Sequence, residues 1–115
     1  MSKYKTVKTY TATIYCGLRE GYTETERSYD VARGVCQSYC DEIGLCVSVE
    51  LIEFFYTDGH ENGVAVRLIN YPRFPESKQK ILKKALRLAK ILMVELCQNR
   101  VSVVCCDKTY MMEVK

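Results

Sequence analysis

The chain has 115 residues, a formal net charge of +3 at pH 7 and a hydrophobic fraction of 48%. This size and composition are typical of a soluble globular protein, so we expect one domain over residues 1–115. No apolar run reaches the roughly 18 to 20 residues that cross a bilayer, and the N-terminus holds no apolar signal core. We therefore expect a cytoplasmic protein without a membrane partner.

The seven cysteines fit neither a disulfide framework nor a zinc site. Their number is odd, no C-x-x-C pair occurs, and the chain has enough apolar residues to fold without covalent staples. Cys36 and Cys40 lie one helical turn apart, and Cys105 and Cys106 are adjacent. We expect reduced thiols that pack as small apolar residues, with no metal and no cofactor.

Charge is distributed unevenly along the chain. Six acids and no Lys or Arg lie between Gly34 and Val66, whereas Arg67 to Lys90 holds eight bases against one acid, Glu76. Such asymmetry can steer an anionic partner, or bring the acidic patch of one copy against the basic patch of another. The basic residues can equally form an ordinary solvated helix face.

The first half of the chain predicts a strand, a helix and a second strand. Thr6–Cys16 alternates apolar with hydroxyl-bearing side chains in a β-branched and aromatic composition, which predicts the first strand. Gly17–Thr25 follows as a loop. Ser28–Ile43 is predicted as a helix with Ser28 as its N-cap, and Gly44 stands where a left-handed C-cap residue is needed. The second strand then runs over Leu45–Thr57.

The second half repeats the pattern. Asp58–Gly63 is rich in residues that tolerate positive φ and predicts a hairpin tip, and Val64–Tyr71 predicts the third strand. After a segment with two prolines, Ser77 is expected to cap a second helix whose outer side is basic. Arg100–Cys106 is predicted as a final strand, and Thr109–Val114 as a tail that can add an edge strand.

The resulting order, β-α-β-β-α-β, predicts an α+β fold of the ferredoxin-like type, with a four-stranded antiparallel sheet and two helices on one face. The other face is left open. Apolar and aromatic side chains are expected on it: Tyr15, Phe54, Tyr56, Ile69 and Tyr71. Because such a face rarely stays bare in water, we expect a homo-oligomer, in multiples of two or three, or another partner there.

This layout resembles known proteins. Leu45–Val49 after the first helix, the aromatic run Phe54–Tyr56 with Gly59, and the final strand with its tail resemble trimeric CutA proteins and their PII-type signal-transduction relatives. The tryptophan usual near the CutA hairpin and the PII nucleotide-binding loop are absent. The resemblance implies homo-oligomerisation and assigns no residue role. The chain is also similar, in a general way, to small accessory proteins of tailed phages, which would place it in the host cytoplasm.

His60 is the one histidine of the chain and lies between Asp58 and Glu61. A neutral imidazole beside two carboxylates can hold a divalent ion or act as a general base. Three ligands within four residues at a hairpin tip rarely converge without support, however. We therefore expect no metal site here.

The loop after the first strand is a candidate anion site. Gly17 and Gly21 let backbone amides approach an anion, while Arg19 supplies charge and Tyr22 a stacking surface. The loop lacks the G-K-[ST] ending of a P-loop. Its glycines can equally serve turn geometry alone.

A second candidate surface lies after the third strand. Asn70, Tyr71, Arg73 and Phe74 stand on a proline-stiffened segment, and form a preorganised surface on which a purine or nicotinamide ring can stack. Arg67 adds positive charge nearby in the sequence. Tyr71 and Phe74 can instead pack against the second helix as core.

These features lead to three hypotheses of function. The first is a non-catalytic homo-oligomer that binds a small anionic, nucleotide-derived ligand between subunits, as a metabolite sensor or a phage-type sequestering protein. The second is single-stranded RNA or DNA binding, because Ile14–Leu18 looks like the first-strand motif of an RNA-recognition domain, although the third strand lacks stacking aromatics. The third is a small nucleotide-cleaving hydrolase using Tyr22, Arg73 or His60. No residue is assigned a catalytic role.

Overall fold

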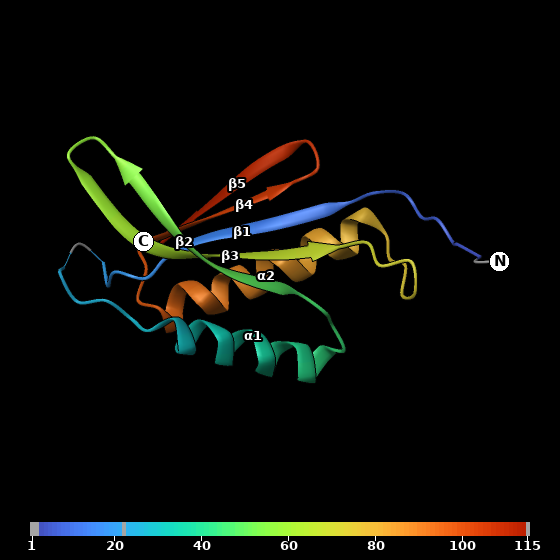
Figure 1. The fold of residues 1–115 in the computed structure, drawn as a ribbon, viewed down its shortest axis with the longest axis horizontal. Helices are drawn as coiled ribbons and strands as arrows, with labels where there is room; N and C mark the ends of the chain where they lie inside the picture. The colour runs from blue at the N-terminus through green and yellow to red at the C-terminus, as the bar shows by residue number, and fades with distance from the viewer. Residues whose placement is uncertain (1–2, 22, 115) are drawn as a thin grey trace.

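The computed structural model describes residues 3–21 and 23–114. Its elements follow in the order β1 (Thr11–Gly17), α1 (Tyr29–Ile43), β2 (Ser48–Tyr56), β3 (Gly59–Ile69), α2 (Lys78–Glu95), β4 (Arg100–Cys105) and β5 (Lys108–Glu113). The strands form one antiparallel sheet in the order β2-β3-β1-β4-β5, and both helices lie on one side of it (Figure 1).

The predicted α+β class with two helices is confirmed, but the sheet in the described part of the chain has five strands and not four. The fifth strand is the C-terminal tail, which pairs along β4 from Arg100 opposite Glu113 to Cys105 opposite Lys108. The expected edge strand therefore forms. No helix among the described residues is long and apolar enough to cross a membrane.

The core lies between the sheet and the two helices. Alternate residues of β1, Ala12, Ile14 and Cys16, are buried on the helix side, as their period of two predicts. The inner side of α2 contributes residues that recur at spacings of three and four: Ile81, Ala85, Leu88, Ala89 and Leu92. All seven cysteines are free thiols.

The predicted helix ends are confirmed. The Ser28 hydroxyl accepts a hydrogen bond from the amide of Val31 at the start of α1, and the Ser77 hydroxyl accepts one from Lys80 at the start of α2. Gly44 closes α1 in the left-handed region, with φ 69° and ψ 59°, and donates its amide to the Cys40 carbonyl. These local signals need no knowledge of the tertiary fold.

β1 begins at Thr11, so the prediction of a strand from Thr6 is wrong. Thr11 pairs with Ile69, the last residue of β3, and no strand extends further to pair with the preceding residues. The amide of Asn70 instead donates to the Tyr10 carbonyl, at 3.0 Å, and its side chain donates to the Lys8 carbonyl, at 2.8 Å. Residues Lys3–Thr9, called the N-terminal arm below, extend away from the domain (Figure 1).

The β2–β3 hairpin turns earlier than predicted. Tyr56 pairs with Gly59, so the turn consists of Thr57 and Asp58, with Asp58 at φ 58°. The segment expected as a hairpin tip, Asp58–Gly63, therefore belongs mostly to β3. β2 itself starts at Ser48 and not at Leu45, and β3 ends at Ile69 and not at Tyr71.

Candidate functional site on the open sheet face

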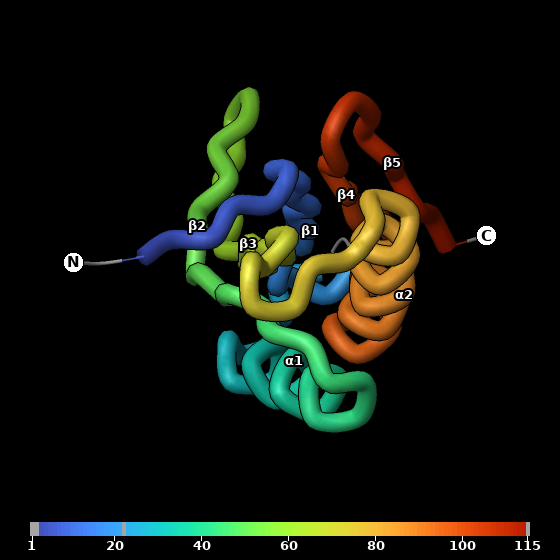
Figure 2. Tube along the Cα trace, turned by 90° about the vertical axis from the view of Figure 1, so that its right-hand side faces the viewer, coloured from blue at the N-terminus to red at the C-terminus, as the bar shows by residue number. Residues whose placement is uncertain are grey.

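The open face of the sheet is a trough. The β2–β3 and β4–β5 hairpins rise on either side of β1, on the side away from the helices (Figure 2). Side chains in the trough leave a pocket of about 550 Å³, a volume suited to a small ligand. We call it the open-face pocket, and it is lined by Tyr15, Gly17, Arg19, Gly21, Phe54, Tyr56, Glu61, Gln98, Asn99, Arg100, Val101, Ser102 and Met111.

Gly17, the last residue of β1, makes room for two polar side chains. A Cβ atom at this position would lie 2.9 Å from Glu61 Oε2 and 2.9 Å from Gln98 Oε1. Gln98 is buried, and its amide nitrogen donates to the carbonyls of Arg19, at 2.6 Å, and Leu96, at 2.9 Å. The amide is thereby held with its oxygen facing Gly17 and the pocket.

Glu61 is the distinctive charged group of the pocket. It is half-buried on β3 and forms no ion pair with any residue that the structure describes. Its negative charge reaches the buried Cys16, whose pKa is raised to about 12, first by burial and then by Glu61. The Glu61 carboxylate interacts with the charge of Arg19 but forms no ion pair with it. Together with the fixed amide oxygen of Gln98 it favours a ligand that carries positive charge or hydrogen-bond donors.

Two aromatic rings form one wall of the pocket, and each lies on a glycine of β3. A Cβ at Gly59 would be 2.1 Å from the ring of Tyr56, and one at Gly63 would be 2.3 Å from the ring of Phe54. The absence of side chains at these glycines lets the rings lie flat against the neighbouring strand. Such flat, fixed faces are suited to stacking a heteroaromatic ring.

Arg19 ties the loop after β1 to the hairpin. Its guanidinium donates to the Tyr56 hydroxyl, at 3.3 Å, and to the His60 carbonyl, at 2.8 Å. The hydrogen bond to Tyr56 raises the pKa of Arg19, which stays charged. On the other side of the loop, the amide of Gly21 donates to the Cys97 carbonyl, at 2.8 Å. These contacts position the rim of the pocket.

The predicted site residues divide into two groups in space. Gly17, Arg19 and Gly21, from the loop after β1, all line the open-face pocket. Tyr22, predicted as a stacking residue of the same loop, lies outside the described residues. The structure therefore gathers three of the four loop residues with the aromatic wall and Glu61.

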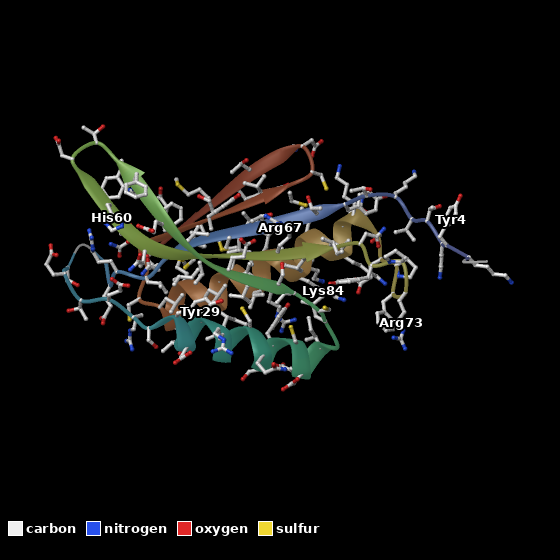
Figure 3. All side chains as sticks on the ribbon, viewed as in Figure 1. Tyr4, Tyr29, His60, Arg67, Arg73 and Lys84 are labelled. Carbon is white, nitrogen blue, oxygen red and sulfur yellow. The ribbon has the colours of Figure 1, made fainter. Side chains whose placement is uncertain are left out.

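The second predicted group, from Arg67 to Phe74, does not reach that pocket. Arg67 lies on the open face, where it forms an ion pair with Glu50 at 3.8 Å. Asn70 is buried and links the N-terminal arm to the connection before α2. Arg73 lies over the ring of Phe74, with 5.3 Å to its centroid, at the opposite end of the domain from His60 (Figure 3).

Tyr71 and Phe74 line a different cavity. This second pocket, of about 340 Å³, lies where the 71–76 connection meets the end of α1, and we call it the end pocket. Its lining is mainly apolar: Gly44, Leu45, Cys46, Leu68, Ile69, Tyr71, Phe74, Glu76, Ile81 and Lys84. The Tyr71 hydroxyl and the Cys46 thiol are hydrogen-bonded, at 3.3 Å, and this contact raises the pKa of Tyr71.

His60 has a different partner from those expected. Its Nε2 lies 2.8 Å from Glu53 Oε2 across the hairpin, and its ring stacks on Phe55 with centroids 4.9 Å apart. These contacts are made by neighbours on β2, and not by Asp58 or Glu61. Among the described residues no cluster of three metal-ligating side chains occurs.

The basic side of α2 and the open face point away from each other. Lys80, Lys83, Arg87 and Lys90 are exposed on α2, which covers the opposite side of the sheet (Figure 2). On the open face, Tyr15 lies between Ala65 of β3 and Ser102 of β4. A strand of RNA that stacked on Tyr15 would thus be remote from these charges, which does not favour the RNA-binding hypothesis.

A larger groove of about 630 Å³ runs between α1 and β2. Its charged residues, Asp30 and Arg33, pair with each other at 3.1 Å, and Arg33 also lies over the ring of Tyr29. Because these charges are already matched, the groove offers a ligand fewer polar partners than the open-face pocket does.

Sequence reasoning missed Gln98 and Arg100 altogether and considered Glu61 only as a neighbour of His60. The three come from segments far apart in the chain. A buried amide side chain such as Gln98 is a strong signal of a polar site, but burial is visible only once the fold is known.

Two solved structures are similar to this chain. A phage SAM lyase in its apo state has a TM-score of 0.76 and 23% sequence identity, with 92% of this chain and 90% of that chain covered. A phage SAM lyase in complex with S-methyl-5′-thioadenosine has a TM-score of 0.69 and 16% identity, with 99% and 96% covered. Neither is a CutA or PII protein, so that resemblance gains no support.

No protein-family model matches the sequence, and no curated protein matches it. The likeness to the two lyase structures therefore establishes the fold of this chain.

Proposed function

We propose that this protein binds S-adenosylmethionine (SAM) in the open-face pocket and cleaves it with release of S-methyl-5′-thioadenosine. The observation that carries the proposal is the half-buried carboxylate of Glu61, which forms no ion pair among the described residues. It lies beside Gly17 and Gln98, in the pocket whose wall is formed by the rings of Phe54 and Tyr56. The fold likeness to two phage SAM lyases, one holding S-methyl-5′-thioadenosine, supports it.

Three parts of SAM have a matching partner in the pocket. The adenine ring suits the flat faces of Phe54 and Tyr56. The positively charged sulfonium suits Glu61, and the α-carboxylate suits the guanidinium of Arg19 or of Arg100, although Arg100 also pairs with Glu113, at 3.6 Å. The predicted ligand was anionic and nucleotide-derived, whereas the charge of Glu61 favours a nucleoside that carries a cation.

The reaction makes modest demands on the site. Releasing S-methyl-5′-thioadenosine breaks the bond between sulfur and Cγ of the amino-acid chain while an oxygen of the substrate's own α-carboxylate bonds to that carbon. The electron pair of the broken bond remains on sulfur, and the amino-acid part leaves as a neutral lactone at the carboxyl end. The sulfonium thereby becomes a neutral thioether, which needs no proton to depart. Positioning in a site that excludes water can supply much of the rate enhancement, so the absence of a conventional acid/base pair is no obstacle.

We infer also that a second copy of the chain covers part of the open face. Exposed apolar residues border the pocket, with Tyr56 49% and Met111 59% exposed, and burying them would close the pocket to water. The order β2-β3-β1-β4 corresponds to a ferredoxin-like core to which β5 is added. Light scattering at micromolar concentration tests whether the chain forms such an assembly. A mass of 13.3 kDa that persists at high concentration would contradict this inference.

The activity test is incubation of the purified protein with SAM, followed by mass spectrometry of the products. We expect S-methyl-5′-thioadenosine to accumulate with time, and calorimetry to detect its binding. Arg73→Ala, at the opposite end of the domain, is the matched control and should leave both measurements unchanged. Binding of SAM without turnover would replace cleavage by sequestration, and no binding of either compound would refute the proposal.

A further inference from the structure

We propose that the N-terminal arm of one copy, Lys3–Thr9, docks into the end pocket of a second copy, with Tyr4 as its anchor. This inference concerns a surface remote from the open-face pocket and does not depend on the proposed activity. It rests on the arm, on the pocket and on the charges around both.

The arm presents an aromatic side chain that its own domain leaves exposed. Tyr4 is 91% exposed on a segment that runs away from the sheet (Figures 1 and 3). The base of the arm is fixed, because Asn70 binds the carbonyls of Lys8 and Tyr10. An almost fully exposed tyrosine on an anchored, protruding segment is suited to inserting into another surface.

The end pocket matches a tyrosine side chain. Its walls include Leu45, Leu68 and Phe74, which can enclose a phenol ring. Glu76 Oε2 is buried beside this cavity and has no hydrogen-bond partner among the described residues, while the other oxygen of the carboxylate binds Lys84. A phenol hydroxyl is a donor that can satisfy such an oxygen after a small rearrangement.

The C-terminal end of α1 gives the end pocket a partial negative charge, which complements the basic arm. The arm carries Lys3, Lys5 and Lys8 and no acid. α1 ends at the pocket with Gly44, has no basic residue in its last turn and points its negative dipole end there. The two charged residues of the lining, Glu76 and Lys84, pair with each other. A basic arm is therefore attracted to the rim into which Tyr4 would insert.

The composition of the arm favours a second copy over the arm's own pocket. To reach its own pocket, the chain would have to reverse direction between Lys8 and Tyr4. The arm, Lys-Tyr-Lys-Thr-Val-Lys-Thr, contains no Gly, Pro, Asn or Asp to make a tight turn, and its β-branched residues favour an extended chain. Extended, the four residues from Lys8 to Tyr4 reach about 14 Å outward.

The test measures binding of a fluorescent peptide with the sequence of the arm to the full-length Tyr4→Ala protein, whose own arm cannot fill the pocket. We expect saturable binding, and at least tenfold weaker binding of the same peptide with Tyr4 replaced by Ala. Cys46→Trp in the receptor fills the pocket and should abolish binding. Phe74→Ala, at an exposed position, removes one wall and should weaken it at least severalfold if the tryptophan variant does not fold.

Light scattering distinguishes docking of the arm into a second copy from insertion of the arm into the pocket of its own copy. A second copy on the open face would also raise the mass above 13.3 kDa, so the comparison with Tyr4→Ala tests the docking of the arm. Docking between copies predicts that Tyr4→Ala shifts the association at least tenfold to higher concentration. A peptide affinity that the substitutions of Tyr4, Cys46 and Phe74 leave unchanged would overturn the proposal, as would the absence of peptide binding. A wild-type chain that stays monomeric with its pocket closed to the peptide would overturn docking between copies.

Discussion

The substitution Gly17→Ala tests the construction of the open-face pocket with a single methyl group. The new Cβ would lie 2.9 Å from both Glu61 Oε2 and Gln98 Oε1, closer than carbon and oxygen approach without displacement. Gln98 is held by two hydrogen bonds, so the half-buried Glu61 side chain must move most. A displaced carboxylate loses a charge-assisted interaction with the ligand of roughly 1.5 to 3 kcal/mol, which weakens SAM binding about ten- to hundredfold.

The same change should leave stability almost unaltered. Alanine in a strand gains about 0.5–1 kcal/mol over glycine, which offsets a small shift of Gln98, so we expect the free energy of unfolding to change by less than about 1 kcal/mol. Calorimetry gives the affinity and urea unfolding gives the stability. The matched control is Gly34→Ala in α1, where a Cβ meets no atom within 4 Å, and which should stabilise the fold without changing the affinity. An unchanged affinity in Gly17→Ala would refute the role of Glu61 in the pocket.

Three further predictions concern charge, pH and the anchoring of the arm. Glu61→Gln should weaken binding of the SAM cation while sparing neutral S-methyl-5′-thioadenosine, and calorimetry with both ligands would contradict this if they weakened equally. Because burial raises the pKa of Cys16 from 9.0 to about 12, the folded protein holds this proton more tightly, so stability is full below about pH 9 and falls above it. Cys16 contributes a slope of up to about 1.4 kcal/mol per pH unit, and urea unfolding between pH 8 and 10 should show the total slope diminished in Cys16→Ala. Cys36 and Cys105, whose pKa values burial also raises, keep their own contributions. Asn70→Ala removes side-chain hydrogen bonds of 2.8 Å to the arm and to Glu76, should cost about 2 kcal/mol in urea unfolding, and should speed proteolysis of the arm; unchanged proteolysis would show that other contacts hold it.

The parts of the fold that the sequence predicts well are those with a local cause. Ser28, Gly44 and Ser77 act on backbone groups within a few residues, so their helix ends follow from residue type alone. The same is true of the burial of Ala12, Ile14 and Cys16 in β1, although Thr13, on the other side of the strand, is buried as well. The predicted start of β1, at Thr6, was wrong because the true start depends on where β3 ends. Ile69 gives no local sign of being the last residue of β3 to pair with β1.

The candidate site is less predictable because it is assembled from distant segments. Gly17 and Arg19 could be chosen as candidates because glycine and arginine suit anion binding on their own. Their relation to Glu61 and Gln98 appears only when β1, β3 and the segment before β4 are placed side by side. Arg67 to Phe74 looked equally suitable by composition, but the strand geometry carries most of that group to the other end of the domain.

The glycine–aromatic contacts of the β2–β3 hairpin constrain how this protein can change during evolution. The rings of Tyr56 and Phe54 each require a glycine at one pairing position of β3, Gly59 and Gly63. One extra residue in the turn would shift the pairing by one position, place side chains beneath both rings and turn the ring-bearing faces away from the pocket. Related sequences that keep this pocket should therefore vary the composition of the hairpin turn freely while conserving its length.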